Sequence, residues 1–136
     1  MTLWTPRMFS IPAQPELSMR LIPPVIVSKG LKLGLVSGAY GLNGSTPPKS
    51  TPWAWSDIEA DHLIKRAEAA KKAGADIVIV AAHSGLEYHH EPTEEQIRLA
   101  QRLTASPAVD MVYCHHSHVV EPWTRMNGKI VMYGLG

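Results

Sequence analysis

Two stretches of the sequence follow the same order: a helical pattern, a short apolar run rich in β-branched residues, and then histidine. The first apolar run, Asp76–Ala82, is followed by His83, and the second, Val109–Tyr113, is followed by Cys114 and the histidine-rich segment 115–118. A run this apolar is typical of a strand buried on both faces of a helix-covered sheet. The alternation of strands and helices therefore predicts an α/β fold, with a mixed or parallel sheet layered with helices.

Capping signals predict where two helices begin. Ser56-Asp57-Ile58-Glu59 and Thr93-Glu94-Glu95-Gln96 both have the capping-box pattern. Helical spacing then extends to Gly74 in the first case and to about Ser106-Pro107 in the second. The apolar residues at helical spacing are Ala60, Leu63, Ile64, Ala67 and Ala70 in the first helix, and Ile97, Ala100 and Leu103 in the second.

Turn dipeptides predict further strands outside these two units. Lys29-Gly30 separates the β-rich runs 24–28 and 31–37, which we expect to form a hairpin. Asn127-Gly128 precedes a last strand at 129–133.

Two regions contain too many helix and strand breakers to form regular elements. Residues 1–24 include five prolines and are expected to be an irregular lead-in to one partial domain, 1–136. Residues 38–55 are rich in Gly and Pro but also carry Asn43 and several aromatic side chains. Loops often carry function, so this segment is a candidate substrate-facing lid; the alternative is that its aromatics anchor it to the core.

Composition excludes several classes of protein. The 13 Lys+Arg and 12 Asp+Glu nearly balance, and no basic stripe is present, so we do not expect nucleic acid as a partner. The single cysteine cannot form an intramolecular disulfide. Apolar runs are far shorter than the roughly 20 residues of a membrane-spanning helix.

The histidines form the most informative constellation. Parallel strands bring their carboxyl ends to one edge of a sheet, so we expect His83 and segment 115–118 to converge there. His116 and His118, two residues apart, can both reach one ion or two adjacent ions. Cys114 either adds a soft ligand or packs in the core.

The other histidines and the acidic residues near the site have plainer interpretations. His62, in a predicted helix, is expected to be exposed, as are His89 and His90, for which substrate contact is the alternative. Glu87 either binds metal, orients an imidazole or is solvated, whereas solvation is expected for Glu91.

Several ordered motifs resemble the capsule-synthesis family, also called poly-γ-glutamate synthesis proteins. The resemblance covers most of the chain from about Pro15 onward. Its motifs are His83-Ser84-Gly85-Leu86-Glu87-Tyr88, Pro92-Thr93-Glu94-Glu95-Gln96, His115-His116-Ser117-His118-Val119-Val120-Glu121-Pro122 and Tyr133-Gly134-Leu135-Gly136.

The resemblance implies part of a calcineurin-like metallophosphoesterase sandwich with a two-metal centre of divalent Mn, Fe or Zn. It implies that His83, His116 and His118 bind metal, that His83 and His116 serve catalysis, and that ions at the site promote hydrolysis. We further expect substrate contacts from His115, Glu87, Tyr88 and Asn43. The expected substrate is a small molecule or polymer of the cell envelope, and segments outside this chain would link it to membrane-associated capsule machinery.

This sequence also departs from the family pattern. The substituted positions are Ser84 for an aromatic residue, Cys114 for glycine, Ser117 for proline and Gly134 for serine. The aspartate and asparagine ligands of the family's N-terminal half have no counterpart here. We therefore expect weak or absent hydrolysis by this chain alone, and the alternative function is a non-catalytic metal-binding or interaction module.

Overall fold

The computed structural model describes residues 23–46, 49–50 and 55–136, and its six strands form one mixed sheet in the order β1-β2-β3-β4-β6-β5. The four inner strands are parallel, and each edge strand is antiparallel to its neighbour. The strands are β1 Val25–Ser28, β2 Leu31–Ala39, β3 Ile77–His83, β4 Met111–His115, β5 Trp123–Met126 and β6 Lys129–Met132. Helix α1 spans Ala60–Lys72 and helix α2 spans Glu94–Ala105. The expected mixed α/β sheet is confirmed, while most of the proposed lead-in lies outside the described residues.

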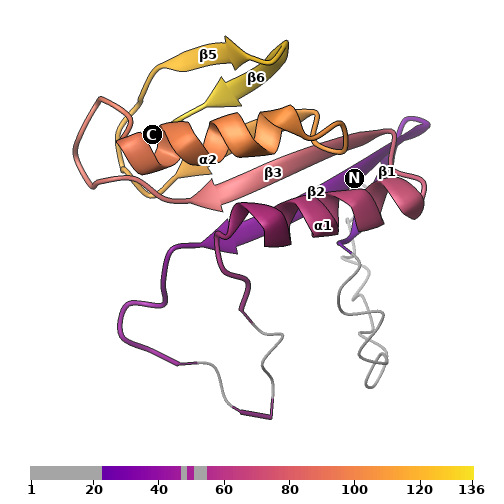
Figure 1. The fold of residues 1–136 in the computed structure, drawn as a ribbon, viewed down its shortest axis with the longest axis horizontal. Helices are drawn as coiled ribbons and strands as arrows, with labels where there is room; N and C mark the ends of the chain where they lie inside the picture. The colour runs from indigo at the N-terminus through magenta and orange to yellow at the C-terminus, as the bar shows by residue number, and fades with distance from the viewer. Residues whose placement is uncertain (1–22, 47–48, 51–54) are drawn as a thin grey trace, which may run out of the picture.

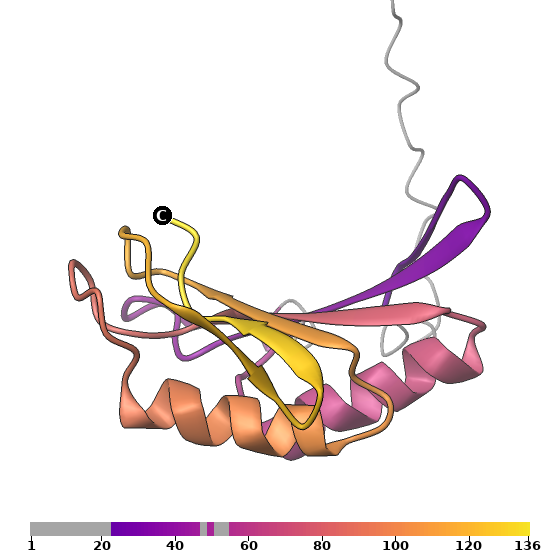
Figure 2. The ribbon, with the colours of Figure 1, turned by 90° about the horizontal axis from the view of Figure 1, so that it is seen from above.

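Both helices lie on the same face of the sheet, as Figures 1 and 2 show. Residues on the helix-facing side of the strands are fully buried, and those on the other side are partly exposed. The core therefore lies between the sheet and the helices. Its fully buried members include Val36, Leu63, Val78, Val80, Leu103, Val112 and Val131.

Both hairpins have turns in which two successive residues adopt positive φ. Lys29 and Gly30 have φ of 50° and 86°, and Asn127 and Gly128 have φ of 50° and 77°. Such turns match the twist of antiparallel strands. The first hairpin was predicted; at the second, the turn was predicted but strand β5 was missed.

Helix α2 begins as predicted, because both halves of its capping box are formed. The Thr93 hydroxyl accepts from the Gln96 backbone N–H at 3.2 Å, and the Gln96 side-chain oxygen accepts from the Thr93 N–H at 2.8 Å. These bonds satisfy two donors that a helix start would otherwise leave unpaired.

The predicted capping box at Ser56 is wrong: α1 begins at Ala60, with Glu59 as its N-cap residue. Residues 56–57 instead lie against the end of β2: the Ala39 N–H donates to the Ser56 carbonyl at 2.9 Å, and Ala39 forms a β-bridge with Asp57. Gly38 permits this approach, since a Cβ there would lie 2.3 Å from the Asp57 carbonyl oxygen.

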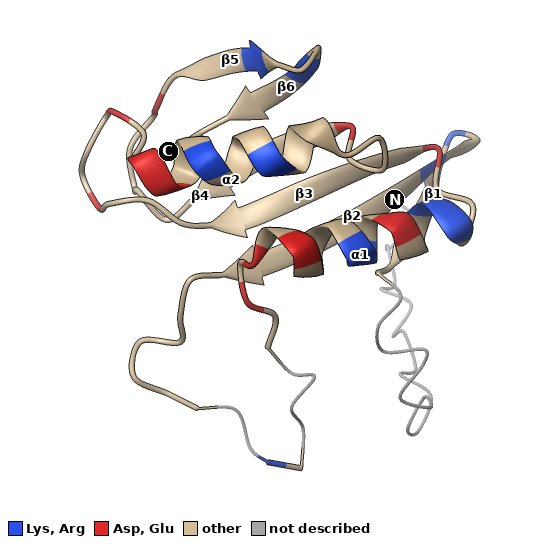
Figure 3. Ribbon diagram, viewed as in Figure 1, with Lys and Arg blue, Asp and Glu red and all other residues tan. Residues whose placement is uncertain are grey.

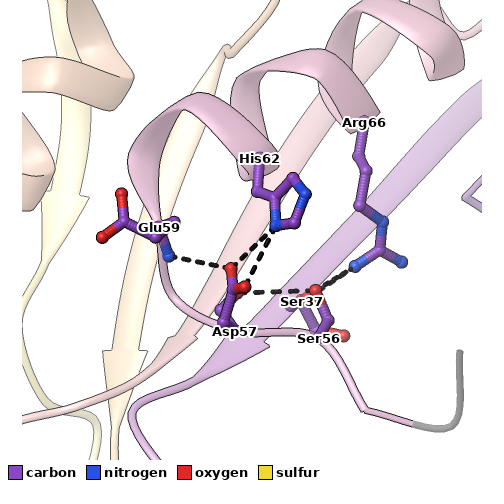
Figure 4. A network of polar contacts seen from close by, with 6 residues as sticks. All are labelled: Ser37, Ser56, Asp57, Glu59, His62 and Arg66. Atoms are coloured by element: carbon purple, nitrogen blue, oxygen red, sulfur yellow. Dashed lines mark hydrogen bonds and ion pairs between the residues drawn. The ribbon is translucent and has the colours of Figure 1, made fainter. Parts of the chain in front are cut away.

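Figure 4 shows the polar network that fixes this start. The Arg66 guanidinium donates to the Ser37 carbonyl at 2.8 Å and to the Ser56 hydroxyl at 2.7 Å. The Asp57 carboxylate accepts from the Glu59 N–H at 3.2 Å. Ser56 is thus held by Arg66 rather than capping the helix.

Strand β4 lies two residues further along the chain than predicted. It reaches His115, and β3 likewise includes His83, so both strands end on histidine. Asp110, expected within β4, instead precedes it, and its carboxylate accepts from the Val78 N–H at 2.7 Å. The shift brings the histidines into the hydrogen-bonded ladder.

Candidate metal centre

The register between β3 and β4 places the two strand-terminal histidines opposite each other. His83 is paired with His115 across the parallel ladder. Their Nδ1 atoms lie 3.0 Å apart, and their ring centroids are 4.7 Å apart, edge to face. A hydrogen bond between two Nδ1 atoms needs one N–H donor and one lone-pair acceptor, so at least one ring is neutral.

The surroundings of both rings favour that neutral form. Desolvation lowers the pKa of His83 below its ordinary value of 6.5, and the nearby His115, His116 and His118 lower it further. Desolvation, followed by His116, also lowers the pKa of His115. Neutral imidazole is the form that binds metal, so the His83 and His115 rings are biased toward that protonation state.

The loop after β4 brings two more imidazoles to the same edge of the sheet. The His116 ring centroid lies 4.6 Å from that of His83 and 5.0 Å from that of Tyr40. The His118 ring lies 6.1 Å from that of His116. The structure thus brings together His83, His115 and His116, with His118 at the margin of the cluster.

Backbone hydrogen bonds hold the loops of the cluster against one another. They join the segments that follow β2, β3 and β4, which are far apart in the sequence. The three bonds run from the Tyr40 N–H to the His83 carbonyl at 3.2 Å, from Ser84 to His115 at 3.0 Å and from Tyr88 to Ser117 at 2.7 Å.

Three residues of the cluster adopt positive-φ backbone conformations, which are unfavourable for residues other than glycine. Tyr88, His116 and His118 have φ of 62°, 111° and 57°. Such conformations cost about 1–3 kcal/mol each and concentrate at functional sites, where surrounding contacts enforce them. The loop contacts therefore hold these side chains in directions that an unconstrained chain would avoid.

The Glu87, His116 and His118 side chains offer the donor set for a divalent ion. One ligand atom from each lies within 4.8 Å of the others, and the His118 Nε2 atom is 3.7 Å from a Glu87 carboxylate oxygen. Two atoms bound to one ion at about 2.0–2.2 Å can be separated by at most about 4.4 Å. The donor atoms span up to 4.8 Å, so the side chains would have to move closer together to share one ion.

The remaining predicted site residues have different positions. Tyr88 is exposed and stacks on His118, with centroids 5.9 Å apart. Asn43 is exposed in the loop after β2, part of which lies outside the described residues. Among the described contacts, none links the Asn43 side chain to the histidines.

Cys114 and the outlying histidines do not join the cluster. Cys114 is fully buried in the core, and desolvation is the main cause that raises its pKa to about 11. His62 is exposed and bonded to Asp57 at 3.0 Å. His89 and His90 are also exposed, as expected, and bond to backbone carbonyls at 2.9 and 3.0 Å.

A cleft of about 520 Å³ opens beside the cluster, and the sequence did not predict it. Its walls come from the start of α1, from one side of α2 and from the loop after β3, including Ile58, Leu86, Leu99 and Arg102. Tyr40 lines the cleft and also stacks on the His83 ring, with centroids 5.8 Å apart. Tyr40 therefore lies between the cleft and the histidine cluster.

Comparison with solved structures identifies the fold. The sulfate thiohydrolase SoxB of Thermus thermophilus, solved in complex with glycerol, matches with a TM-score of 0.53 and 19% sequence identity. The match covers 80% of this chain and 19% of that one. It agrees with the expected α/β fold and, at this identity, shows the fold alone.

Sequence comparison identifies the family. The PGA biosynthesis protein CapA of Bacillus subtilis (strain 168) is 37% identical over 93 residues, and the capsule biosynthesis protein CapA of Bacillus anthracis is 33% identical over 96. Each match covers 68% of this chain but only 24% and 23% of the respective relatives, so the chain spans about a quarter of their length. The model of the bacterial capsule synthesis protein family PGA_cap matches residues 16–136. The chain therefore belongs to the bacterial capsule synthesis protein family.

Proposed function

We propose that this chain carries the histidine side of a metal-dependent hydrolase centre. One observation carries the proposal: the ligand atoms of Glu87, His116 and His118 lie within 4.8 Å of one another, beside the paired rings of His83 and His115. A carboxylate with several imidazoles suits divalent Zn, Fe or Mn. A bound divalent ion would activate water and polarise a substrate oxygen.

The protein's own groups would have separate tasks. Glu87, His116 and His118 would hold the ion, and His83 would either join them or hold a proton in its bond with His115. Tyr88, stacked on His118, is exposed at the cluster and would contact the substrate. The proposed reaction is hydrolysis of a phosphoryl or acyl group.

The proposed substrate is a small molecule or polymer of the cell envelope, since both named relatives serve capsule or PGA biosynthesis. Figure 3 marks both acidic and basic positions along each helix, and the chain carries 13 Lys+Arg against 12 Asp+Glu, which supports the expectation that nucleic acid is not a partner. Among the described residues, no helix is long and apolar enough to cross a membrane. An association with membrane-bound capsule machinery is part of the proposal.

The decisive experiment removes two imidazoles together. In the His116→Ala/His118→Ala double variant, we expect binding of added Zn²⁺ or Mn²⁺ to be lost while the folded structure persists, because loop residues contribute little to the core. Isothermal titration and circular dichroism measure the two properties. The matched control is His62→Ala, which removes an exposed imidazole outside the cluster. Unchanged stoichiometry in the double variant would contradict the assigned site.

The second candidate function is a non-catalytic metal-binding or interaction module. It is favoured by the single carboxylate in the donor group and by the exposure of Glu87 and His118. Hydrolysis of a generic phosphomonoester or phosphodiester with added Mn²⁺ separates the two. Metal binding without hydrolysis supports the module, and hydrolysis that disappears in the double variant supports the enzyme.

A further inference from the structure

One buried amide contacts three loops, two of which follow the strands that end on histidine. Gln96, in the first turn of α2, is completely buried. Its Nε2 group lies 3.3 Å from each of three acceptors, which belong to the loops after β3, β4 and β6. These acceptors are the Ser84 carbonyl, the Glu121 carboxylate and the Tyr133 carbonyl.

The capping box fixes the direction in which this amide points. The Gln96 Oε1 atom accepts from the Thr93 N–H at 2.8 Å, so Nε2 is turned away from the helix end and toward the loops. A buried acceptor that loses its donor costs about 1–3 kcal/mol. The two amide N–H groups are shared among the three acceptors, so loss of the amide would leave buried acceptors in these loops without a donor.

The packing around the amide leaves little room for other arrangements. A Cβ at Gly85 would lie 2.9 Å from the Gln96 Nε2 atom, and one at Gly134 would lie 2.6 Å from the Glu121 carboxylate. Glu121 is buried, and Gln96 is the one described side chain that donates to it. Displacement of Gln96 would therefore also remove the described side-chain donor of the Glu121 carboxylate.

Two of these loops, those after β3 and β4, carry the proposed ligands. Ser84 directly follows His83, and Glu121 is three residues beyond His118. Since His116 and His118 have left-handed backbone conformations, their directions depend on contacts made by the rest of their loop.

We propose that Gln96 is a positioning residue for the metal centre, which it serves by tying the loops after β3, β4 and β6 to one buried point. The inference rests on the proposed function, because it takes the histidine cluster to be a metal site. Among the described hydrogen bonds, none joins the Gln96 side chain to an imidazole.

The test compares Gln96→Glu with Thr93→Ala. Gln96→Glu keeps an oxygen that can cap α2 but removes the amide donor, whereas Thr93→Ala removes the other half of the capping box and leaves the amide in place. Affinity for Co²⁺ and its visible absorption spectrum, which reports ligand geometry, are measured on folded protein. We expect Gln96→Glu to weaken Co²⁺ binding about 10- to 100-fold and to change the spectrum. Thr93→Ala should leave both unchanged.

Amide hydrogen exchange, measured on the metal-free protein, tests whether Gln96 holds the three loops together. In Gln96→Glu, exchange should quicken at Ser84, Tyr88 and Glu121, whose N–H groups bond between loops. In Thr93→Ala, it should quicken mainly at the Gln96 N–H, which loses its hydroxyl acceptor. Uniformly faster exchange in Gln96→Glu, with a wild-type Co²⁺ spectrum, would reduce Gln96 to a general stabilising residue and overturn the proposal.

A second variant covers the case in which Gln96→Glu does not fold, because a new carboxylate would face Glu121. Gln96→Met has similar length without charge or donor, and the same loss of Co²⁺ affinity and loop protection is expected. Wild-type affinity in folded Gln96→Met would overturn the proposal. If the wild-type protein binds no Co²⁺, the proposed function fails, and the exchange measurements still decide whether Gln96 ties the loops.

Discussion

At the scale of single residues, the paired His83 and His115 rings link protonation to the stability of the metal-free protein. The folded-state pKa of each lies below the ordinary value of 6.5. Between the folded and unfolded pKa values, the unfolded chain binds more protons than the folded one, so stability rises with pH in this window. The contribution is complete above about pH 6.5 and is lost as the pH falls toward the folded-state values.

We therefore expect the free energy of unfolding to decrease between pH 7.5 and pH 5.5. Urea unfolding at the two pH values measures the change. In the His83→Gln/His115→Gln variant the difference should be smaller, because the two titrating groups are gone. A difference of wild-type size in this variant would show that other groups cause it.

The Glu87 carboxylate is predicted to matter for metal affinity although it is half exposed. Its oxygen lies 3.7 Å from the His118 Nε2 atom, and it supplies the negative charge of the donor group. Glu87→Gln should weaken Zn²⁺ binding by at least about tenfold, measured by competition with a chelating dye. The matched control is Glu91→Gln, an exposed residue of the same loop, which should bind Zn²⁺ as the wild type does. Equal affinities in the two variants would remove Glu87 from the site.

At the scale of elements, α1 is held to the sheet by a narrow buried stripe. Leu63, Ala67 and Ala70 are fully buried, and a Cβ on Gly38 of β2 would lie 3.0 Å from the Leu63 side chain. The stripe contains one large side chain, so most of the apolar packing of α1 depends on Leu63.

Leu63→Ala should lower the free energy of unfolding by about 2–5 kcal/mol, since it removes a buried side chain and leaves a cavity. Guanidinium unfolding followed by circular dichroism measures the loss. Leu86→Ala serves as the control because Leu86 is 53% exposed, and it should change stability by less than about 0.5 kcal/mol. Similar losses in the two variants would mean that α1 is not anchored through Leu63.

The sequence predicted well those elements that are determined by residues close together in the chain. The capping box at Thr93 and the turn at Lys29-Gly30 involve neighbouring residues, so their patterns are visible in the chain itself. The start of α1 depends instead on the bridge between Ala39 and Asp57, which no local pattern reveals. Strand β5 exists because it pairs with β6, and its sequence alone did not indicate a strand.

The same distinction applies to the candidate site. Histidines at the ends of two apolar runs predicted that His83 would approach His116, because parallel strands end at one edge of a sheet. The grouping of Glu87 with His118 depends on loop conformation, including the positive φ of Tyr88 and His118. The sequence did not predict the role that we propose for Gln96, because the capping-box pattern was a sufficient reason for a glutamine at that position.

At the scale of the whole molecule, the core and the candidate site lie in different places. The core lies between the sheet and the two helices on one of its faces, and the site lies at one edge of the sheet. Figure 2 shows both helices below the sheet, while the histidines lie at the carboxyl ends of the parallel strands. Substitutions in the cluster can therefore alter ion binding with little effect on the core, which is what the proposed experiments require.

The pairing of His83 with His115 means that the proposed ion site is complete only when β3 and β4 lie side by side. A chain that has formed only β2, α1 and β3 possesses one imidazole of the cluster, and the others arrive only when α2 and β4 have crossed back over the sheet. An ion that binds the complete arrangement would favour the finished native state by mass action. Cation binding would then report that β3 and β4 have docked, and the ion-bound protein would resist unfolding more than the ion-free protein does.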